Sequence, residues 1–226
     1  LLDLCRPLLV GEVAVWRRAG WRPGRIAVWD TGLGLKLPPY GRVSKAGGAS
    51  SFAAVAAAVR LAGRKLADAV VTAPISKEAW SLAGVSFPDH TEYLRSVTGS
   101  DAQMILAAPQ RGLWCALVTR HIPLAQVAGS LSVQRVMHAA RILHAALRQV
   151  GRPRPRMVLC GLNPHAGEGG LLGREEQKVL VPAVRRARRC GLDLSGPLPA
   201  DAAWRLHAEG GCDGLICLYH DQALIP

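Results

Sequence analysis

Short apolar runs that end in polar, histidine-bearing loops occur three times in the 226-residue chain. They are residues 113–119 followed by His121, residues 157–160 followed by His165, and residues 214–219 followed by His220. Runs of this kind are typical of strands buried in a parallel sheet. Because α/β proteins build active sites at the carboxyl ends of parallel strands, such a sheet would bring the three histidines to one edge. The pattern therefore predicts an α/β fold with a metal site at that edge.

Further apolar runs predict four more strands. These are residues 7–10, 25–29, 69–72 and 104–107. The last of them forms a hairpin with residues 113–119 around a turn at 109–112. A helix over 11–19 separates the first two strands. The glycine- and proline-rich residues 31–48 then predict a loop or an irregular β excursion.

Helical periodicity is clearest over residues 132–150, where apolar residues recur along one side. An alanine-rich stretch predicts another helix, which Ser50 or Ser51 caps and which runs to Leu66. Ser76 is predicted to cap a short helix after residues 69–72.

Three more helices are predicted in the parts of the chain that surround the apolar runs. One begins near residues 90–91, one covers 201–207, and one covers 175–189 with Pro182 kinking or splitting it. Residues 196–199, Gly-Pro-Leu-Pro, are predicted to form a turn.

The composition fits a soluble α/β protein of one large or two small domains, because half of the residues are hydrophobic and few are aromatic. The formal net charge of +12 invites a nucleic-acid interpretation. The arginines are scattered, however, and their densest group lies late in a predicted helix, where cations suit the helix dipole. No aromatic residues interleave with them, as single-strand binding would favour. We therefore expect a phosphorylated small substrate rather than nucleic acid.

The six cysteines include no Cys-x-x-Cys pair, and Cys115, Cys160 and Cys217 lie inside predicted strands. They are interpreted as core residues of a protein in a reducing compartment, not as disulfides or zinc ligands. No apolar run is long enough to predict a membrane span. The chain begins without Met, so we expect a fragment of a longer protein.

Three imidazoles suit a metal because neutral histidine is its commonest side-chain ligand, and three leave positions open for water or substrate. The alternative is that each histidine is a hydrogen-bonded loop residue, because no local motif forces the three to converge. We interpret His138, His144 and His207 as structural, since they lie within predicted helices.

Two carboxylates stand near the predicted sheet edge. Asp221 adjoins His220, and Asp201 follows the turn at 196–199. Either residue is placed to orient a ligand, contact substrate or assist proton transfer. Asp201 equally suits the N-cap of the helix that follows it.

Anion binding is predicted at two further places. His90 and Thr91 lie at the amino end of a predicted helix, where phosphates and carboxylates bind. Lys77 follows a predicted strand and either holds a phosphate or is solvated. The glycines of residues 167–173 resemble a phosphate loop only weakly, because they fit neither the Walker pattern nor Gly-x-Gly-x-x-Gly in its proper context.

Six segments, in this order, resemble the PdxA family, the 4-hydroxythreonine-4-phosphate dehydrogenases of pyridoxal phosphate biosynthesis. They are Thr-Ala-Pro-Ile-Ser-Lys-Glu (72–78), Phe-Pro-Asp-His-Thr-Glu-Tyr (87–93), Thr-Arg-His-Ile-Pro-Leu (119–124), Gly-Leu-Asn-Pro-His-Ala-Gly-Glu (161–168), Gly-Pro-Leu-Pro-Ala-Asp (196–201) and Tyr-His-Asp-Gln (219–222). The resemblance covers nearly the whole chain. It implies a three-layer α/β/α fold like that of isocitrate and isopropylmalate dehydrogenases. Over residues 1–226 it implies a partial dehydrogenase of two intertwined α/β subdomains, with the active site in the cleft between them.

The resemblance also assigns site residues. It implies metal ligands, a substrate-binding group and two acidic residues near the substrate that we take as catalytic. The metal ligands are His121, His165 and His220, the substrate-binding pair is His90 and Thr91, and the acidic residues are Asp201 and Asp221. We add Lys77 to the substrate-binding group from its position after a predicted strand. The cofactor-binding residues are unassigned. A cytoplasmic homodimer with a shared active site is implied, with neither nucleic acid nor membrane as a partner.

The implied reaction is the oxidation of 4-phosphooxy-L-threonine to 2-amino-3-oxo-4-phosphooxybutanoate, followed by decarboxylation, in pyridoxal 5'-phosphate biosynthesis. It uses NAD or NADP and a divalent metal, which is zinc, magnesium or cobalt. Two alternatives stay open. One is a paralogue acting on 4-phospho-D-threonate or 4-phospho-D-erythronate, and the other is a truncated, non-catalytic metal-binding remnant.

The chain departs from the family pattern in two residues and at its ends. Asp89 and Ala223 stand where the family usually has glycine. The amino-terminal Gly-Asp-Pro-Ala-Gly-Ile-Gly-Pro-Glu stretch is missing, as is the later segment that supplies a lysine and an arginine to the substrate. We therefore expect a chain truncated at both ends, with uncertain activity.

Overall fold

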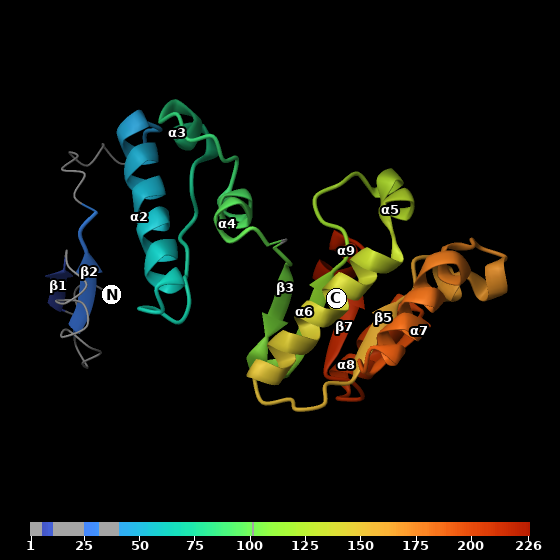
Figure 1. The fold of residues 1–226 in the computed structure, drawn as a ribbon. Coiled ribbons are helices and arrows are strands. Elements are labelled where there is room, and N and C mark those ends of the chain that lie inside the picture. Colours follow the sequence, from blue (N-terminus) through green and yellow to red (C-terminus); the bar gives the residue numbers. More distant parts are fainter. Residues whose placement is uncertain (1–5, 11–24, 32–40, 101) are drawn as a thin grey trace. The chain divides into compact units, whose positions relative to one another are not determined.

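The computed structural model describes residues 6–10, 25–31, 41–100 and 102–226. The chain divides into two compact units, residues 1–102 and residues 103–226 (Figure 1). The predicted helix at 11–19 and half of the predicted loop at 31–48, namely residues 32–40, lie outside the described residues. Residues 45–48 are helical, so the predicted loop was wrong there.

Within its described residues, the first unit contains two short strands and three helices. Strands β1 (Arg6–Val10) and β2 (Arg25–Trp29) pair in parallel, as an isolated two-stranded sheet within the described residues. The helices are α2 (Lys45–Gly63), α3 (Lys77–Leu82) and α4 (His90–Thr98). Both strands agree with the sequence-based expectation.

Helix α2 begins earlier than predicted. The hydroxyl of Ser44 accepts the N–H of Gly47 at 3.1 Å, so Ser44 is the N-cap and the prediction of Ser50 or Ser51 was wrong. Ser51 instead accepts a hydrogen bond from the indole Nε1 of Trp80 at 2.9 Å and thereby links α2 to α3. The two helices also approach closely at Gly48, where a β-carbon would overlap the carbonyl of Ala79.

Aromatic rings form much of the packing in the first unit. Phe52 of α2 lies edge-to-face against Trp80 at 5.3 Å and against Tyr93 at 5.1 Å, measured between ring centroids. Phe87 packs against Phe52 and against Tyr93. Trp80 is fully buried, and edge-to-face geometry adds to what its area contributes.

The strand predicted at 69–72 is not formed. Residues 67–76 carry no regular secondary structure, and Val71 is 96% exposed. A β-branched run becomes a strand only where a neighbour supplies hydrogen bonds and cover, because β-propensity mainly measures packing against other strands. Within the described residues this segment pairs with no strand.

Helix α2 also qualifies the expectation that no segment is long enough to cross a membrane. Among the described residues it is the single helix that is long and apolar enough by length and composition, with a mean hydropathy of 1.2. A helix that meets this test is weak evidence for a membrane, and α2 packs on α3 through Gly48 and Ser51.

The second unit is built on a five-stranded sheet with the order β3-β4-β7-β5-β6. The strands are β3 (Ile105–Ala108), β4 (Leu113–Leu117), β5 (Met157–Cys160), β6 (Leu194–Leu198) and β7 (Gly214–Cys217). Strands β3 and β4 form the predicted antiparallel hairpin around the short 3-10 turn η1 (Pro109–Arg111), and the other pairs are parallel.

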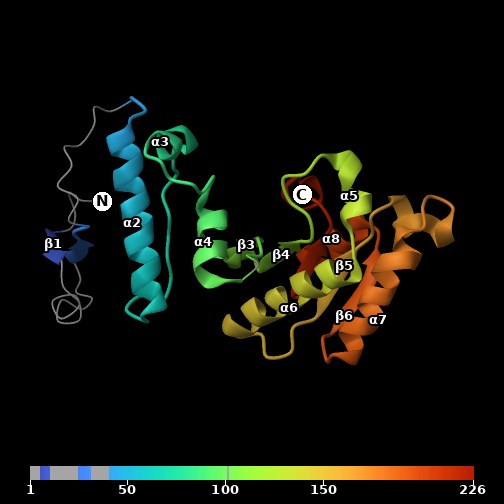
Figure 2. The same ribbon diagram turned by 45° about the horizontal axis from the view of Figure 1, so that its top comes forward.

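Helices cover both faces of this sheet, as Figures 1 and 2 show. The helical segments are α5 (Leu124–Ser130), α6 (Val133–Gln149), η2 (Pro164–Gly170), η3 (Glu176–Leu180), α7 (Val181–Arg189), α8 (Ala200–Ala208) and α9 (His220–Leu224). Strand residues such as Leu159 and Ile216 pack in the cluster with α6 and α7, and their neighbours Val158 and Cys217 pack in the cluster with α8. The predicted three-layer α/β/α arrangement is confirmed.

Several local predictions in this unit are confirmed. The helix predicted over 132–150 is α6, and the structure adds that Ser132 is its N-cap, whose hydroxyl accepts the N–H of Arg135 at 3.2 Å. Pro182 lies in the first turn of α7, directly after the π-helical segment η3, so the predicted split of the helix at 175–189 is present. Asp201 lies inside the first turn of α8 and Pro199 is its N-cap residue, so Asp201 does not act as the N-cap.

Strand β6 was missed, because its residues Gly-Pro-Leu-Pro were predicted to form a turn. In the part of the chain that the structure describes, it is an edge strand that pairs only with β5. An edge strand tolerates Pro197, since a proline without an N–H needs no partner on the open side. The glycine and prolines of the segment therefore indicated a turn and did not reveal its pairing with β5.

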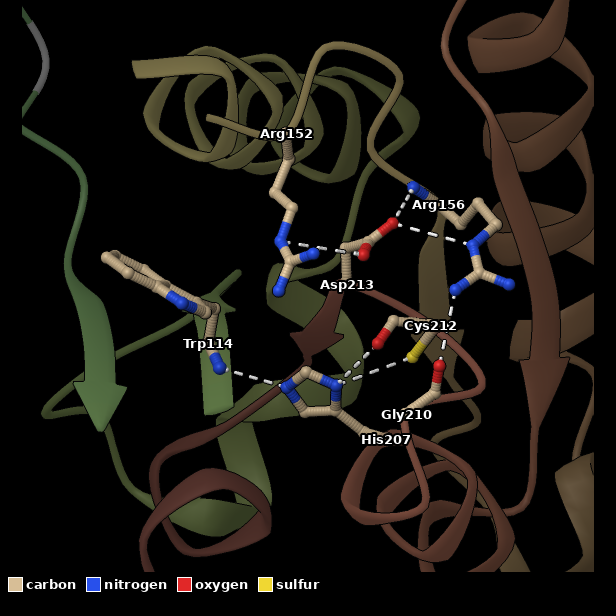
Figure 3. Close-up of polar contacts among 7 residues, drawn as sticks. All are labelled: Trp114, Arg152, Arg156, His207, Gly210, Cys212 and Asp213. Carbon is tan, nitrogen blue, oxygen red and sulfur yellow. Dashed lines mark hydrogen bonds and ion pairs between the residues drawn. The ribbon is translucent and has the colours of Figure 1, made fainter. Parts of the chain in front are cut away.

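His207 is structural, as predicted, and joins three parts of the second unit (Figure 3). It is 3% exposed on α8, its Nε2 accepts the N–H of Trp114 at 2.9 Å, and its Nδ1 lies 3.0 Å from the carbonyl of Cys212. This pairing requires a neutral ring with its proton on Nδ1. Nearby, Asp213 accepts the N–H of Arg156 at 2.8 Å.

We expect the free energy of unfolding to fall as the pH drops below about 6.5. Burial lowers the pKa of His207, so the unfolded chain takes up a proton at a higher pH than the folded chain does. The contribution of His207 is thus complete above the unfolded pKa and is lost as the pH falls toward the folded one. Urea unfolding at pH 7.5 and 5.5 measures the difference. His144→Gln should keep most of it and His207→Gln should reduce it; an unchanged difference in His207→Gln would contradict the assignment.

Candidate active site and metal centre

The three predicted metal-ligating histidines follow three adjacent parallel strands. His121 follows β4, His220 follows β7 and His165 follows β5, and β7 lies between the other two strands. Asp201 follows β6, the next strand in the order. The carboxyl ends of parallel strands meet at one edge, so the sheet places all four residues in one row of loops.

Two of the histidines are already close together. The ring centroids of His121 and His220 are 5.8 Å apart. The Nδ1 of His220 lies 2.8 Å from Oδ1 of Asp221, which orients the ring and leaves Nε2 free. Metal-ligating histidines usually make this kind of contact, with the second nitrogen bonded to a carboxylate. Of the roles considered for Asp221, the geometry favours orientation of His220.

His121 and His165 have backbone conformations that side-chain-bearing residues seldom adopt. Their φ angles are 52° and 53°, and Ala166 and Glu168 in the same loop have φ angles of 52° and 42°. A left-handed residue other than glycine costs of order 1 kcal/mol or more, and such residues concentrate at functional sites. Both histidines are exposed, so the strain does not arise from core packing.

The donor set suits a divalent metal by its chemistry and its place on the sheet. Three neutral imidazoles match zinc or cobalt better than magnesium, which prefers oxygen ligands. Among the described residues, however, no three histidine, cysteine, aspartate or glutamate side chains gather closely enough to hold an ion. The structure brings His121 and His220 together and leaves His165 on the loop after the neighbouring strand, so the complete triad stays a prediction.

The two predicted catalytic carboxylates line one pocket. A cavity of about 450 Å³ is bordered by Asp201, Trp204, Tyr219 and Asp221, with further lining from α9 and the residues after it. Asp201 reaches the pocket from the first turn of α8, and Asp221 reaches it from the first turn of α9. The pocket therefore offers two carboxylates and two aromatic rings beside the row of histidines.

The predicted substrate-binding residues lie in the first unit. His90 and Thr91 begin α4, and the Nε2 atom of His90 is buried without a hydrogen-bond partner in the described residues. A buried polar atom without a partner is uncommon and marks a place where a ligand can supply one. The N-cap of α4 is Asp89, whose Oδ1 accepts the N–H of Glu92 at 2.9 Å. Lys77 is exposed at the start of α3.

The family model for the pyridoxal phosphate biosynthetic protein PdxA matches residues 5–226. The chain belongs to the PdxA family. It is 42% identical over 216 residues to the 4-hydroxythreonine-4-phosphate dehydrogenase of Pseudomonas aeruginosa, covering 93% of this chain and 64% of that protein. It is 36% identical over 250 residues to a Symbiobacterium thermophilum protein that carries the provisional name D-threonate 4-phosphate dehydrogenase, covering 98% of this chain and 72% of that one.

A crystal structure of the PdxA dehydrogenase from Klebsiella pneumoniae has the same fold. Its TM-score is 0.88 at 35% identity, over 98% of this chain and 66% of that one. The predicted likeness to isocitrate and isopropylmalate dehydrogenases is thus confirmed through the PdxA fold. The chain spans about two thirds of the length of these PdxA relatives.

Gln222 and Thr119, which lie in the PdxA motifs, hydrogen-bond to the backbone of the loops at the site. Neither role was predicted from the sequence. Gln222 accepts the N–H of Leu218 at 2.7 Å and donates to the carbonyl of Gly161 at 2.8 Å, which joins the loop after β7 to the loop after β5. The Thr119 hydroxyl donates to the carbonyl of Leu218 at 2.6 Å and joins β4 to the same point. The only signal in the sequence was their presence inside the histidine motifs.

Replacing Gln222 with methionine should lower the free energy of unfolding by about 2 kcal/mol, because a buried N–H and a buried carbonyl lose their partners while the volume is kept. Equilibrium urea unfolding measures the loss. Gln149→Met, at the exposed end of α6, is the matched control and should change the stability by less than about 0.5 kcal/mol. Equal stabilities of the two variants would show that Gln222 does not join the loops.

Proposed function

We propose that the chain carries the metal- and substrate-binding part of a metal-dependent, NAD(P)-linked dehydrogenase. The proposed reaction oxidises 4-phosphooxy-L-threonine to 2-amino-3-oxo-4-phosphooxybutanoate, which then decarboxylates, as a step in pyridoxal 5'-phosphate biosynthesis. The observation that carries the proposal is the row of His121, His220, His165 and Asp201 after four adjacent parallel strands, in a chain of the PdxA family. The names of the PdxA relatives supply the substrate.

In this proposal the metal is held by His121, His165 and His220. A divalent cation there would supply Lewis acidity, which favours loss of the substrate hydroxyl proton and stabilises negative charge that develops during decarboxylation. Asp221 keeps the His220 ring oriented through the contact at Nδ1. Asp201 faces the same pocket and is the candidate acceptor of the hydroxyl proton.

The anionic ends of the substrate are assigned to the first unit. His90 offers the buried Nε2 that has no partner in the described residues, and Thr91 offers a hydroxyl at the amino end of α4. Lys77 adds a positive charge at the start of α3. The cofactor is NAD or NADP, which accepts the hydride, and its binding residues are unassigned. A cytoplasmic homodimer with a shared active site completes the proposal.

The test is NADH or NADPH formation by the purified chain with added Zn²⁺, Co²⁺ or Mg²⁺. The reaction is run in parallel with 4-phosphooxy-L-threonine, 4-phospho-D-threonate and 4-phospho-D-erythronate. Turnover with the first substrate supports the proposal. Bound metal without turnover on any of the three would instead identify a non-catalytic metal-binding remnant, and would overturn the proposed activity of this chain.

The second candidate is the paralogue that acts on a phosphorylated sugar acid. It is favoured by the 36% identity to the Symbiobacterium thermophilum protein with the D-threonate name. The two substrates differ in the group next to the carboxylate, an amine in one and a hydroxyl in the other. A preference for 4-phospho-D-threonate or 4-phospho-D-erythronate in the same assay would move the chain to that branch.

A further inference from the structure

A buried carboxylate lies beneath the loop that carries His165. Glu176, the first residue of η3, is 4% exposed. Its Oε1 accepts the backbone N–H groups of Leu162 at 2.9 Å and Asn163 at 2.8 Å. Its Oε2 accepts the side-chain amide of Asn163 at 2.9 Å. All of these contacts fix the two residues that lead from β5 into the histidine loop.

The burial of this carboxylate is costly unless donors compensate it. Taking a charged group out of water is unfavourable, and short hydrogen bonds from N–H groups to a carboxylate are the strong ones that offset the cost. A leucine of similar size would fill the space without that cost. The carboxylate at Glu176 is therefore best explained by what it holds in place, namely the backbone at Leu162 and Asn163.

Two glycines of the loop make room for this network. A β-carbon at Gly167 would lie 2.6 Å from Oε2 of Glu176, and one at Gly173 would overlap the Asn163 amide and lie 2.6 Å from Oε2 of Glu175. Both glycines also have positive φ angles, 80° and 142°. Two of the four glycines that resembled a phosphate loop thus serve the Asn163–Glu176 contact.

A strained backbone segment begins two residues after Asn163. From His165 to Gly170 six consecutive residues have positive φ angles, and three of them carry side chains. Such a run is unfavourable for residues with a β-carbon and persists only where surrounding contacts determine it. Glu176 supplies those contacts before the run, and the hydrogen bond from Gln177 to the carbonyl of Gly169 supplies one at its end.

We infer that Glu176 is a positioning residue for the metal centre. Its carboxylate fixes the backbone of Leu162 and Asn163, and thereby sets where the left-handed loop presents His165 to the edge shared with His121 and His220. The inference rests on the proposed function, because it takes His165 as a metal ligand. It assigns Glu176 no contact with metal or substrate.

The first test compares three variants of the full chain by titration with Co²⁺, followed by visible absorption. Glu176→Leu keeps the volume and removes all acceptors, whereas Glu176→Gln keeps one. Glu175→Gln is the matched control, because Glu175 is the neighbouring carboxylate and accepts the Asn163 side-chain amide at 2.9 Å, whereas the backbone N–H groups of Leu162 and Asn163 go to Glu176. Residues that orient metal ligands typically change metal affinity by 10- to 100-fold. We expect a loss in that range for Glu176→Leu, a loss of less than about tenfold for Glu176→Gln, and less than about twofold for Glu175→Gln.

A purely structural role would give a different result. It would lower the melting temperature of Glu176→Leu and leave the Co²⁺ affinity and the shape of the cobalt bands unchanged below that temperature. Unchanged affinity in a folded Glu176→Leu variant therefore overturns the inference. If that variant does not fold, Glu176→Gln carries the same comparison, and partial recovery of affinity relative to Glu176→Ala supports it.

The second test needs no metal and separates this inference from the proposed function. Amide hydrogen exchange at Leu162 and Asn163 is measured by NMR in the metal-free chain. We expect exchange at least about tenfold faster in Glu176→Leu and unchanged in Glu175→Gln, because only the first loses the acceptor of both amides. If the unsubstituted chain binds no Co²⁺, the proposed metal centre fails. Unchanged exchange in Glu176→Leu overturns the role of Glu176, whatever the metal result.

Discussion

Replacement of His165 with alanine is expected to abolish bound metal and turnover together. Removing one of three imidazoles leaves too few protein ligands to hold a divalent ion tightly. Since residues that merely orient ligands cost 10- to 100-fold, loss of a ligand should lower kcat/KM by at least about 10³-fold. Metal content by emission spectroscopy and NADH formation measure the two effects on one preparation.

The control for this prediction is another histidine of the same unit. His144→Ala removes an imidazole from helix α6, away from the row of strand-end loops, and should leave both metal content and turnover unchanged. His165→Asn is a second control for folding, because asparagine accepts the left-handed backbone at that position better than most residues. Metal-dependent turnover that survives in His165→Ala would remove this residue from the ligand set.

Replacement of Gly48 with alanine is expected to destabilise the first unit by about 2 kcal/mol. Alanine favours a helix over glycine by about 1 kcal/mol, so the intrinsic effect is stabilising. At Gly48, however, the new β-carbon would overlap the backbone carbonyl of Ala79, which cannot rotate away as a side chain could. The overlap therefore outweighs the propensity, and α2 and α3 must separate. Equilibrium urea unfolding measures the result.

Gly63→Ala is the matched control, because Gly63 is the last residue of the same helix and a β-carbon there meets nothing within 4 Å. Only the helix propensity acts at this position, so the variant should gain up to about 0.5 kcal/mol. The two substitutions should thus shift stability in opposite directions. A gain from both would mean that α2 and α3 do not approach closely at Gly48.

The sequence predicted those elements whose signals are local. Strand β5 was predicted with its bounds because all four of its residues are buried, which makes the run continuously apolar. Ser76 was predicted as a cap, since a helix cap depends on residues three positions away, whereas Ser132 was predicted only as the start of its helix. The cap at Ser44 was missed because the glycines that follow it do not favour a helix, and packing against α3 overrides that preference.

The sequence predicted the layout of the candidate site but not the hydrogen bonds that hold its loops in place. Each histidine follows a strand, so its place at the sheet edge followed from the α/β pattern alone. Gln222 and Glu176 act on positions 61 and 13 residues away, and no local pattern predicts such contacts. The strand expected at 69–72 failed for the converse reason, because its apolar run has no partner strand in the described residues.

The left-handed backbone at His121 and His165 limits how these positions can change over time. Glycine, asparagine and aspartate fit that backbone with little or no strain, and none of them replaces an imidazole on zinc or cobalt without loss. The replacements that disturb folding least at these two positions are thus ones that would weaken the proposed metal site. A gene copy under selection for solubility alone would keep its sheet, its helices and its melting temperature while it lost the proposed catalytic activity. Stability measurements would not reveal that loss, whereas the identity of the residues at these two positions would.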